Sequence, residues 1–184
     1  MKFIKTEIPD LYIIEPSVFG DARGYFLESF NLEKFEENVC PIKFIQDNES
    51  KSSKGVLRGL HFQKPPFNQA KLVRCVEGSV MDVAVDIRKG SPTYGKHVAI
   101  ELSGENKRQL FVPRGFAHGF SVLSETAVFA YKVDNTYTPE SDSGICFDDK
   151  ELNIDWGLTE EDIQLSEKDK NLQSFKDLDS PFKF

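Results

Sequence analysis

Between Tyr12 and Ile145 the chain alternates short β-branched or aromatic segments with turn residues. Short segments of this kind, bounded by glycine, proline, asparagine and aspartate, are typical of antiparallel strands. The pattern predicts an all-β fold, a sandwich or barrel. The expected strands lie in GYFLESF (24–30), FIQDN (44–48), GVLRGLHFQ (55–63), AKLVRCVEG (70–78), SVMDVAVDIR (79–88), KHVAIELSGENKRQLFVP (96–113) and GFSVLSETAVFAYKV (119–133).

Helical patterns are scarce within this stretch and occur at its edges. Residues 31–38 (NLEKFEEN) begin with an asparagine suited to capping a helix, so a short helix is expected there. The tail contains two candidate capping boxes, TEED at 159–162 and SEKD at 166–169, which predict one or two helical turns. No repeat or long linker divides the chain, and residues 1–184 are expected to form a single domain.

Strand parity places isolated charges on apolar faces. Lys71 shares a face with Val73 and Cys75, and Asp82 shares one with Ala84. Burying a charge inside a barrel costs free energy unless the charge is paired with an opposite charge or hydrated. A solvent-accessible pocket lined by these residues explains the pattern. The alternative, in which Lys71 and Asp82 face solvent on the outer surface, stays open at this point.

Charge narrows the classes of partner. The 23 Lys and Arg against 30 Asp and Glu give a net charge of −7, which argues against nonspecific binding to nucleic acids or anionic membranes. An anionic small substrate then requires a local basic cluster. The first residues lack the apolar core of a secretion signal, and no segment approaches transmembrane length. Three dispersed cysteines without a C-x-x-C pair favour reduced thiols and a cytoplasmic protein.

Two histidine segments, 55–63 and 113–120, resemble the two motifs of the cupin barrel. The first keeps His61 but has Gln63 where a metal-binding cupin has its second histidine, and the second keeps His118. A transition metal requires three or four good ligands, and a neutral amide is a poor substitute for imidazole. We therefore expect no catalytic metal.

An imidazole without a metal is free to accept a proton at cellular pH. His61 is thus a candidate base, and the alternative is a hydrogen-bonded histidine of the core. His97, which follows the Pro-Thr-Tyr-Gly segment at 92–95, is assigned to that structural class.

Eight separated segments carry a more specific resemblance. They are GDARGYFLESF (20–30), FIQDNES (44–50), RGLHFQ (58–63), QAKLVRCVEG (69–78), MDVAVDIR (81–88), FVPRGFAHGF (111–120), AYKVDNTY (130–137) and LSEKD (165–169). Together they resemble the dTDP-4-dehydrorhamnose 3,5-epimerase family along nearly the whole chain. The resemblance implies a cofactor-free cupin jelly-roll barrel with short peripheral helices, a homodimer, and inversion of C3 and C5 in a dTDP-4-dehydro-6-deoxy-glucose substrate.

The resemblance also implies roles for four residues. His61 matches the family's base, Tyr131 its acid, Asp169 the carboxylate that pairs with the base, and Lys71 the cation near the C4 oxygen. Two structural alternatives remain: Asp169 caps a helical turn with Ser166, and Tyr131 packs in the core.

For binding, Arg23 and Arg58 match phosphate contacts, a task that suits the guanidinium fork. The remaining matches are aromatic neighbours (Phe26, Tyr137), polar nucleotide contacts (Glu28, Gln46, Asp47, Asn48), and residues near the sugar and diphosphate (His118, Lys168), with Asp142 where some relatives carry glutamate. Arg58 and His61 have opposite parity on a straight strand, so a bulge, a bend or a subunit boundary is required. In the family, an N-terminal strand pairs with the neighbour's sheet, so residues 23–48 are candidates for completing the partner's site.

Three rival functions stay open. The first is a mono-epimerase that acts at C3 or C5 alone in a related dTDP-deoxysugar pathway. The second is a metal-dependent cupin oxygenase or isomerase. The third is a non-enzymatic module that binds sugar nucleotides.

Overall fold

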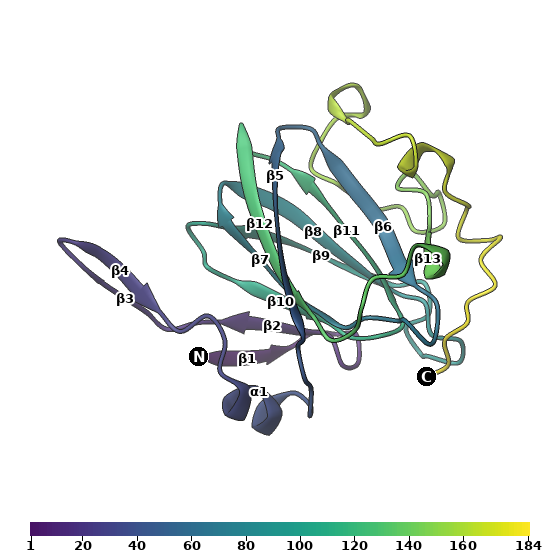
Figure 1. Ribbon diagram of the computed structural model, residues 1–184. Coiled ribbons are helices and arrows are strands. Elements are labelled where there is room, and N and C mark those ends of the chain that lie inside the picture. The colour runs from purple at the N-terminus through teal and green to yellow at the C-terminus, as the bar shows by residue number, and fades with distance from the viewer.

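The structure, a computed structural model, describes residues 1–184 and is built around two antiparallel sheets that face each other (Figure 1). The six-stranded sheet has the order β1 (Lys2–Lys5), β2 (Tyr12–Glu15), β10 (Gln109–Val112), β7 (Lys71–Glu77), β12 (Thr126–Val133) and β5 (Gln46–Ser53). The five-stranded sheet has the order β13 (Asp142–Gly144), β6 (Leu57–Gln63), β11 (Phe116–Val122), β8 (Ser79–Asp86) and β9 (His97–Ser103). The expectation of an antiparallel all-β fold is confirmed.

The main core lies between the two sheets. Val73 and Phe129 enter it from the six-stranded sheet, and Val80, Ala84 and Phe120 enter it from the other. Because side chains alternate across a strand, the next residues of β8 point to the opposite face, where a second apolar cluster forms. Both faces of β8 are thus buried.

Peripheral segments cover the outer faces of the sheets. Helix α1 (Leu32–Asn38) packs Phe35 against Leu72 and Phe111 of the six-stranded sheet. The expected helix is confirmed with its cap, because Asn31 Oδ1 accepts a hydrogen bond from the backbone N–H of Lys34 at 3.1 Å. The C-terminal segment, shown in yellow in Figure 1, runs along the outside of the five-stranded sheet.

The turns expected in the tail are present as single 3₁₀ turns, not as α-helix. They are η2 (Glu160–Asp162) and η3 (Asp169–Asn171), and a third such turn, η1 (Pro139–Ser141), precedes β13. No helix of the structure combines the length and apolar character needed to cross a membrane.

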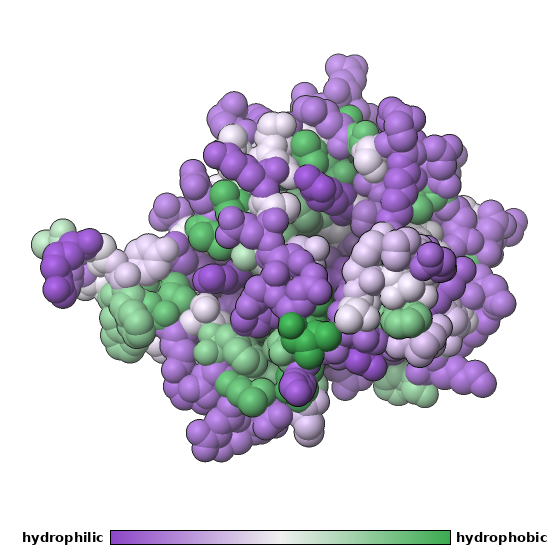
Figure 2. All heavy atoms as spheres, in the orientation of Figure 1, coloured by the Kyte–Doolittle hydropathy of each residue, from purple (hydrophilic) through white to green (hydrophobic).

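A two-stranded hairpin, β3 (Val18–Asp21) and β4 (Gly24–Leu27), projects away from the body of the molecule (Figure 1). Its apolar side chains are exposed, including Phe19 at 65% and Phe26 at 69%. In the same orientation, Figure 2 shows hydrophobic surface on this projecting arm. An isolated hairpin has little stability in water, so an exposed apolar arm of this kind indicates an unfilled contact surface.

Candidate active site

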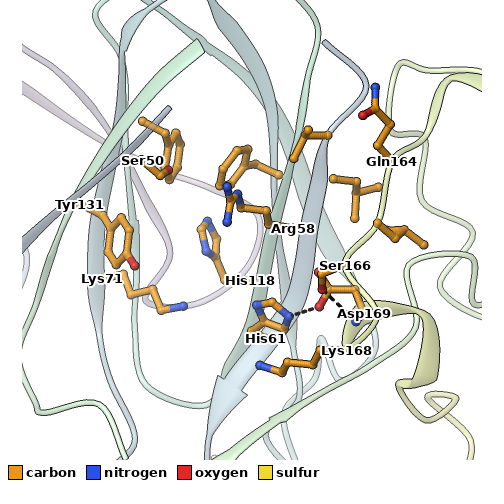
Figure 3. A pocket seen from close by; sticks show the side chains of 15 residues that line it. Ser50, Arg58, His61, Lys71, His118, Tyr131, Gln164, Ser166, Lys168 and Asp169 are labelled. Atoms are coloured by element: carbon orange, nitrogen blue, oxygen red, sulfur yellow. Dashed lines mark hydrogen bonds and ion pairs between the residues drawn. The ribbon is translucent and has the colours of Figure 1, made fainter. Parts of the chain in front are cut away.

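A cavity of about 560 Å³ opens between the two sheets and the C-terminal segment (Figure 3). Its polar lining comes from Ser50, Arg58, His61, Lys71, His118, Tyr131, Gln164, Ser166, Lys168 and Asp169, and its apolar lining from Val56, Leu57, Phe120, Phe129 and Leu165. Seven of the residues singled out from the sequence are therefore brought together: Arg58, His61, Lys71, His118, Tyr131, Lys168 and Asp169. The pocket inferred from strand parity is confirmed.

A β-bulge allows Arg58 and His61 to line the same cavity. In the pairing of β6 with β11, His61 lies opposite His118 and Arg58 lies opposite Phe120, so three steps on one strand match two on the other. The extra residue lies within β6, next to Gly59, whose φ is +130°. A bulge of this kind reverses side-chain parity, which removes the conflict between the two positions.

His61 is held by a carboxylate from the other end of the chain. Its Nε2 lies 2.5 Å from Oδ1 of Asp169, and the Asp169 side chain is only 4% exposed. An ionised carboxylate can only accept, so Nε2 carries the proton and Nδ1 is left as the acceptor. Figure 3 shows the second ring nitrogen of His61 turned away from Asp169, toward the side of the cavity where Lys71 lies.

The C-terminal segment is anchored next to β6. Val56 and Gln164 form a parallel β-bridge. Two backbone hydrogen bonds flank it, one on each side. Further along, Ser166 Oγ accepts the backbone N–H of Asp169 at 3.2 Å. The hydrogen bond to Ser166 and the pairing with His61 therefore coexist in Asp169, because its backbone makes one and its side chain the other, although the N-cap position of η3 is Lys168 and not Ser166.

The pKa of Asp169 is lowered. Burial by itself raises the pKa of this carboxyl, but the hydrogen bond and positive charge of His61, the hydroxyl of Ser166 and the ammonium of Lys168 outweigh burial. Asp169 is therefore ionised at neutral pH and accepts the hydrogen bond from Nε2 of His61.

Lys71 and Tyr131 face His61 from the opposite sheet (Figure 3). Burial lowers the pKa of Lys71 to about 8, while the carboxylates of Asp82 and Asp142 oppose that change. Burial raises the pKa of Tyr131, and the charge of Arg58 opposes this. At neutral pH the pocket thus presents an ammonium and a protonated phenol across from an imidazole.

At the edge of the cavity, Asp142 links two segments. Its carboxylate accepts a hydrogen bond from the Tyr137 hydroxyl at 2.9 Å and pairs with the ammonium of Lys168. The Tyr137 ring is 56% exposed beside this pair. These three predicted binding residues therefore form one chain of contacts at the rim.

The predicted residues of the N-terminal arm lie outside this cavity. Arg23 sits at the exposed tip of the β3–β4 hairpin and pairs with Asp21 at 2.6 Å. Phe26 is on the same hairpin, and Glu28 lies at its base, where it binds Lys34 at 2.7 Å. Within one chain these residues do not meet His61.

The three predicted polar residues of β5 divide between its faces. Asn48 pairs with Tyr131 and Ser50 with Phe129, so these side chains continue the cavity-facing row of β12, and Gln46 follows the same parity. Asp47 has the opposite parity and binds Lys132 at 2.7 Å. Gln46 and Asn48 are thus placed toward the mouth of the cavity, whereas Asp47 faces away from it.

Gln63 has a structural task. Its amide nitrogen donates to the carbonyls of Phe67 and Thr136 at 2.7 and 3.0 Å, and its amide oxygen accepts the N–H of Thr138 at 2.6 Å. All of its hydrogen bonds go to backbone. No group of three or more His, Cys, Asp or Glu side chains in the chain is arranged to hold a metal ion.

Sequence reasoning did not select every residue of the site. Ser50 follows from the parity of Asn48, and Ser166 was considered only as a helix cap. Asp82 was singled out only as an isolated charge and given no role; it is fully buried behind His118, whose Nε2 lies 3.0 Å from each of its carboxylate oxygens. Gln164 belongs to no motif in the sequence, so its place in the cavity follows only from the path of the tail.

Comparison with known proteins identifies a family. Residues 5–177 match the family model described as dTDP-4-dehydrorhamnose 3,5-epimerase. The chain is 59% identical over 180 residues to a protein of that name from Shigella flexneri, covering 97% of this chain and 98% of that protein.

Solved structures of sugar-nucleotide epimerases are also similar to this chain. A dTDP-6-deoxy-D-glucose-3,5-epimerase from Legionella pneumophila Philadelphia 1, in complex with dTDP-4-keto-L-rhamnose, is 50% identical, with a TM-score of 0.95 over 100% of this chain and 98% of that one. A 3'-monoepimerase from Streptomyces bikiniensis, in complex with dTDP-quinovose, is 30% identical, with a TM-score of 0.86 over 93% and 86% of the two chains.

Proposed function

The chain belongs to the dTDP-4-dehydrorhamnose 3,5-epimerase family, and from this premise we propose that it inverts C3 and C5 of dTDP-4-dehydro-6-deoxy-D-glucose to give dTDP-4-dehydro-L-rhamnose. The observation that supports this most directly is the imidazole–carboxylate pair of His61 and Asp169, which faces an ammonium and a phenol across one cavity. Both inversions occur beside the C4 ketone, where carbon-bound protons are acidified.

The base in this proposal is His61. Its Nδ1 takes the proton from the carbon next to the ketone, and Asp169 stabilises the resulting imidazolium through Nε2–H. The electrons of the broken C–H bond move onto the C4 oxygen and form an enolate. Lys71, which is protonated below pH about 8, supplies the positive charge that this oxygen needs.

Inversion requires that the new proton arrive from the opposite face. Tyr131 lies on the opposite sheet from His61, and burial keeps its phenol protonated. In the proposed step, the phenol donates to carbon as the enolate electrons return, so that the C4 ketone is restored and a phenolate remains. Solvent then returns the proton to Tyr131 and removes the one on His61.

The nucleotide is proposed to bind along the rim. The sugar and diphosphate are proposed to lie beside three cationic or polar residues of the cavity lining, Arg58, His118 and Lys168. Arg58 is anchored on Ser52 Oγ, with distances of 3.3 and 3.2 Å from two guanidinium nitrogens. Tyr137, Asp142, Gln46 and Asn48 are assigned to the outer part of the ligand.

We infer a homodimer in which the β3–β4 arm of one subunit completes the site of its partner. The arm carries Arg23 and Phe26 on an exposed apolar hairpin that projects from its own subunit. With Glu28 at its base, it would deliver a cation for phosphate and an aromatic ring for the base of the nucleotide. A cytoplasmic location fits the three free cysteines.

The test of this function is product identification. Purified protein is incubated with dTDP-4-dehydro-6-deoxy-D-glucose, and the coupling pattern of the sugar ring protons is read by NMR. The proposal predicts the L-rhamno configuration, with no change in turnover after treatment with a chelator. An unchanged hexose, or activity that requires added metal, would overturn it.

A further inference from the structure

A second imidazole–carboxylate pair lies deeper in the same cavity. His118 of β11 directs its Nε2 at both carboxylate oxygens of Asp82 on β8, each at 3.0 Å. The Asp82 side chain is 0% exposed and the His118 side chain 7%. The strand register explains the contact: Asp82 lies opposite Phe120, so His118 is its diagonal neighbour on the same face.

The charge of Asp82 has no fixed cation beside it. Its hydrogen bonds go to His118 alone, and neither Lys nor Arg pairs with it. Asp86, on the same strand and equally buried, is instead neutralised by Arg88 at 2.9 Å and bonded to two hydroxyls. Burying a carboxylate without such partners costs free energy. A positive charge is therefore expected near Asp82.

The candidate for that charge is Lys71, which lines the same cavity as His118, the partner of Asp82. Of the two carboxylates that support the charged form of Lys71, Asp82 has the larger effect. Asp142 is the other, and it is already paired with Lys168 and bonded to Tyr137. The charged and titratable groups around the Lys71 side of the cavity are Arg58 and His61 on β6, Asp82 on β8, His118 on β11, Tyr131 on β12, Asp142 on β13, and Lys168 and Asp169 of the C-terminal segment.

We propose that Asp82 is a positioning residue of the reaction, which fixes the ring of His118 and supplies the buried negative charge that keeps Lys71 an ammonium facing the C4 oxygen. The inference rests on the proposed function for its catalytic meaning. Asp82 accepts the Nε2–H of His118, so Nδ1, which makes no hydrogen bond within the chain, is left for the ligand. Asp82 itself touches neither the substrate nor the transferred protons.

The first test is the pH profile of Asp82→Asn. The amide oxygen can still accept the Nε2–H of His118, but the charge is lost, so the ammonium of Lys71 is less stable and loses its proton at lower pH. The alkaline limb of the kcat profile, where kcat falls as the pH rises, then moves to lower pH. For each pH unit of this shift, kcat at pH values above the limb is reduced about tenfold. Asp82→Glu retains the charge and is expected to retain the limb.

Asp86→Asn is the matched control. It removes an equally buried carboxylate from the same strand, but one that serves Arg88, Ser91 and Thr93. A loss of stability without any movement of the alkaline limb is expected. If Asp86→Asn moves the limb as far as Asp82→Asn, the effect is a general one of buried charge and the proposal fails.

A substrate-free measurement separates this inference from the proposed function. Protein labelled with ¹³C-lysine is titrated, and the Cε signal of Lys71 is assigned with Lys71→Arg. In Asp82→Asn, or in Asp82→Ser if the asparagine variant does not fold, Lys71 is expected to lose its proton at lower pH than in the unaltered protein. An unchanged Lys71 titration overturns the inference, whether or not the protein is an epimerase. A shifted titration in a protein that does not epimerise refutes only the function.

Discussion

At the scale of single residues, the site depends on which of its charged side chains are buried and which are exposed to the cavity. His61 is partly exposed to the cavity, whereas its partner Asp169 is buried and keeps its negative charge. Strand parity indicated in advance that Lys71 faces the same way as Val73 and Cys75. Parity alone leaves open which face of a strand is inside, so the burial of Asp82 became evident only when both sheets were in place.

Replacement of His61 by asparagine removes the proton acceptor while the side chain remains polar. Activity is expected to fall by about 10²- to 10⁴-fold, the usual contribution of a general base. Turnover is measured by NMR, and circular dichroism checks the fold. His97→Asn is the control, since His97 lies on β9 and does not line the cavity. Activity within tenfold of the unaltered protein would rule out His61 as the base.

The pKa of Lys71 sets the alkaline limit of activity. Because the ammonium is the required form, kcat is expected to fall as the pH rises through about 8. Lys71→Arg keeps its charge at all accessible pH values, so its residual activity should lack this limb. A limb at the same pH in both proteins would assign it to another group.

The same shift affects stability. The pKa of Lys71 is lower in the folded chain than in the unfolded chain, so between pH about 8 and the ordinary lysine value the unfolded state binds more protons. The contribution of Lys71 to the free energy of unfolding therefore increases with pH across this window. Denaturant titrations of the unaltered protein and Lys71→Met at several pH values measure the difference.

At the scale of elements, β6 and the C-terminal segment build the catalytic pair together. The strands of the two main sheets follow the alternation of apolar and polar residues, and most were predicted from it. The opposite parity of Arg58 and His61 called for a bulge, a bend or a subunit boundary, and the structure has the bulge. β13 and the tail from 163 to 173 were not predicted as neighbours of β6, because their few backbone bridges leave no periodic signal.

The bulge makes a specific demand on Gly59. A Cβ at this position would lie 2.5 Å from Gly119 Cα and 2.9 Å from the carbonyl oxygen of His118, at a φ of +130°. Gly59→Ala is expected to combine this clash with backbone strain of about 1–3 kcal/mol. Each kcal/mol lowers the melting temperature by roughly 2–4 °C in a chain of this size.

Gly90→Ala separates the two causes. Gly90 also has a positive φ, +86°, but nothing lies within 4 Å of the position of its Cβ. It should therefore show only the strain of the backbone, and Gly59→Ala should melt at a lower temperature. Equal melting temperatures would mean that the close approach of β6 and β11 does not constrain the site.

At the scale of the whole molecule, the separation of Arg23 from His61 is the main structural argument for a dimer. The arm's exposed apolar residues were visible in the sequence as GYFLESF, but a local pattern does not reveal what covers it. The family resemblance supplied that expectation, and the projecting hairpin in Figure 1 agrees with it.

Complementation tests the shared site. His61→Asn and Arg23→Ala are each expected to be inactive or weak, and a mixed dimer would contain one site with both residues intact. After random exchange of equal amounts, about a quarter of the unaltered activity should return, since half of the dimers are mixed and each has one good site. If no activity returns although mixed dimers form, Arg23 and His61 act within the same subunit.

The central claim is that His61 and Tyr131 exchange protons on both sides of the C4 ketone. Reaction in deuterated water, followed by NMR of the sugar, tests this claim most directly. The account predicts deuterium at both C3 and C5 in the L-rhamno product. Label at only one of these carbons would identify a mono-epimerase, and product without label at either carbon would contradict the mechanism.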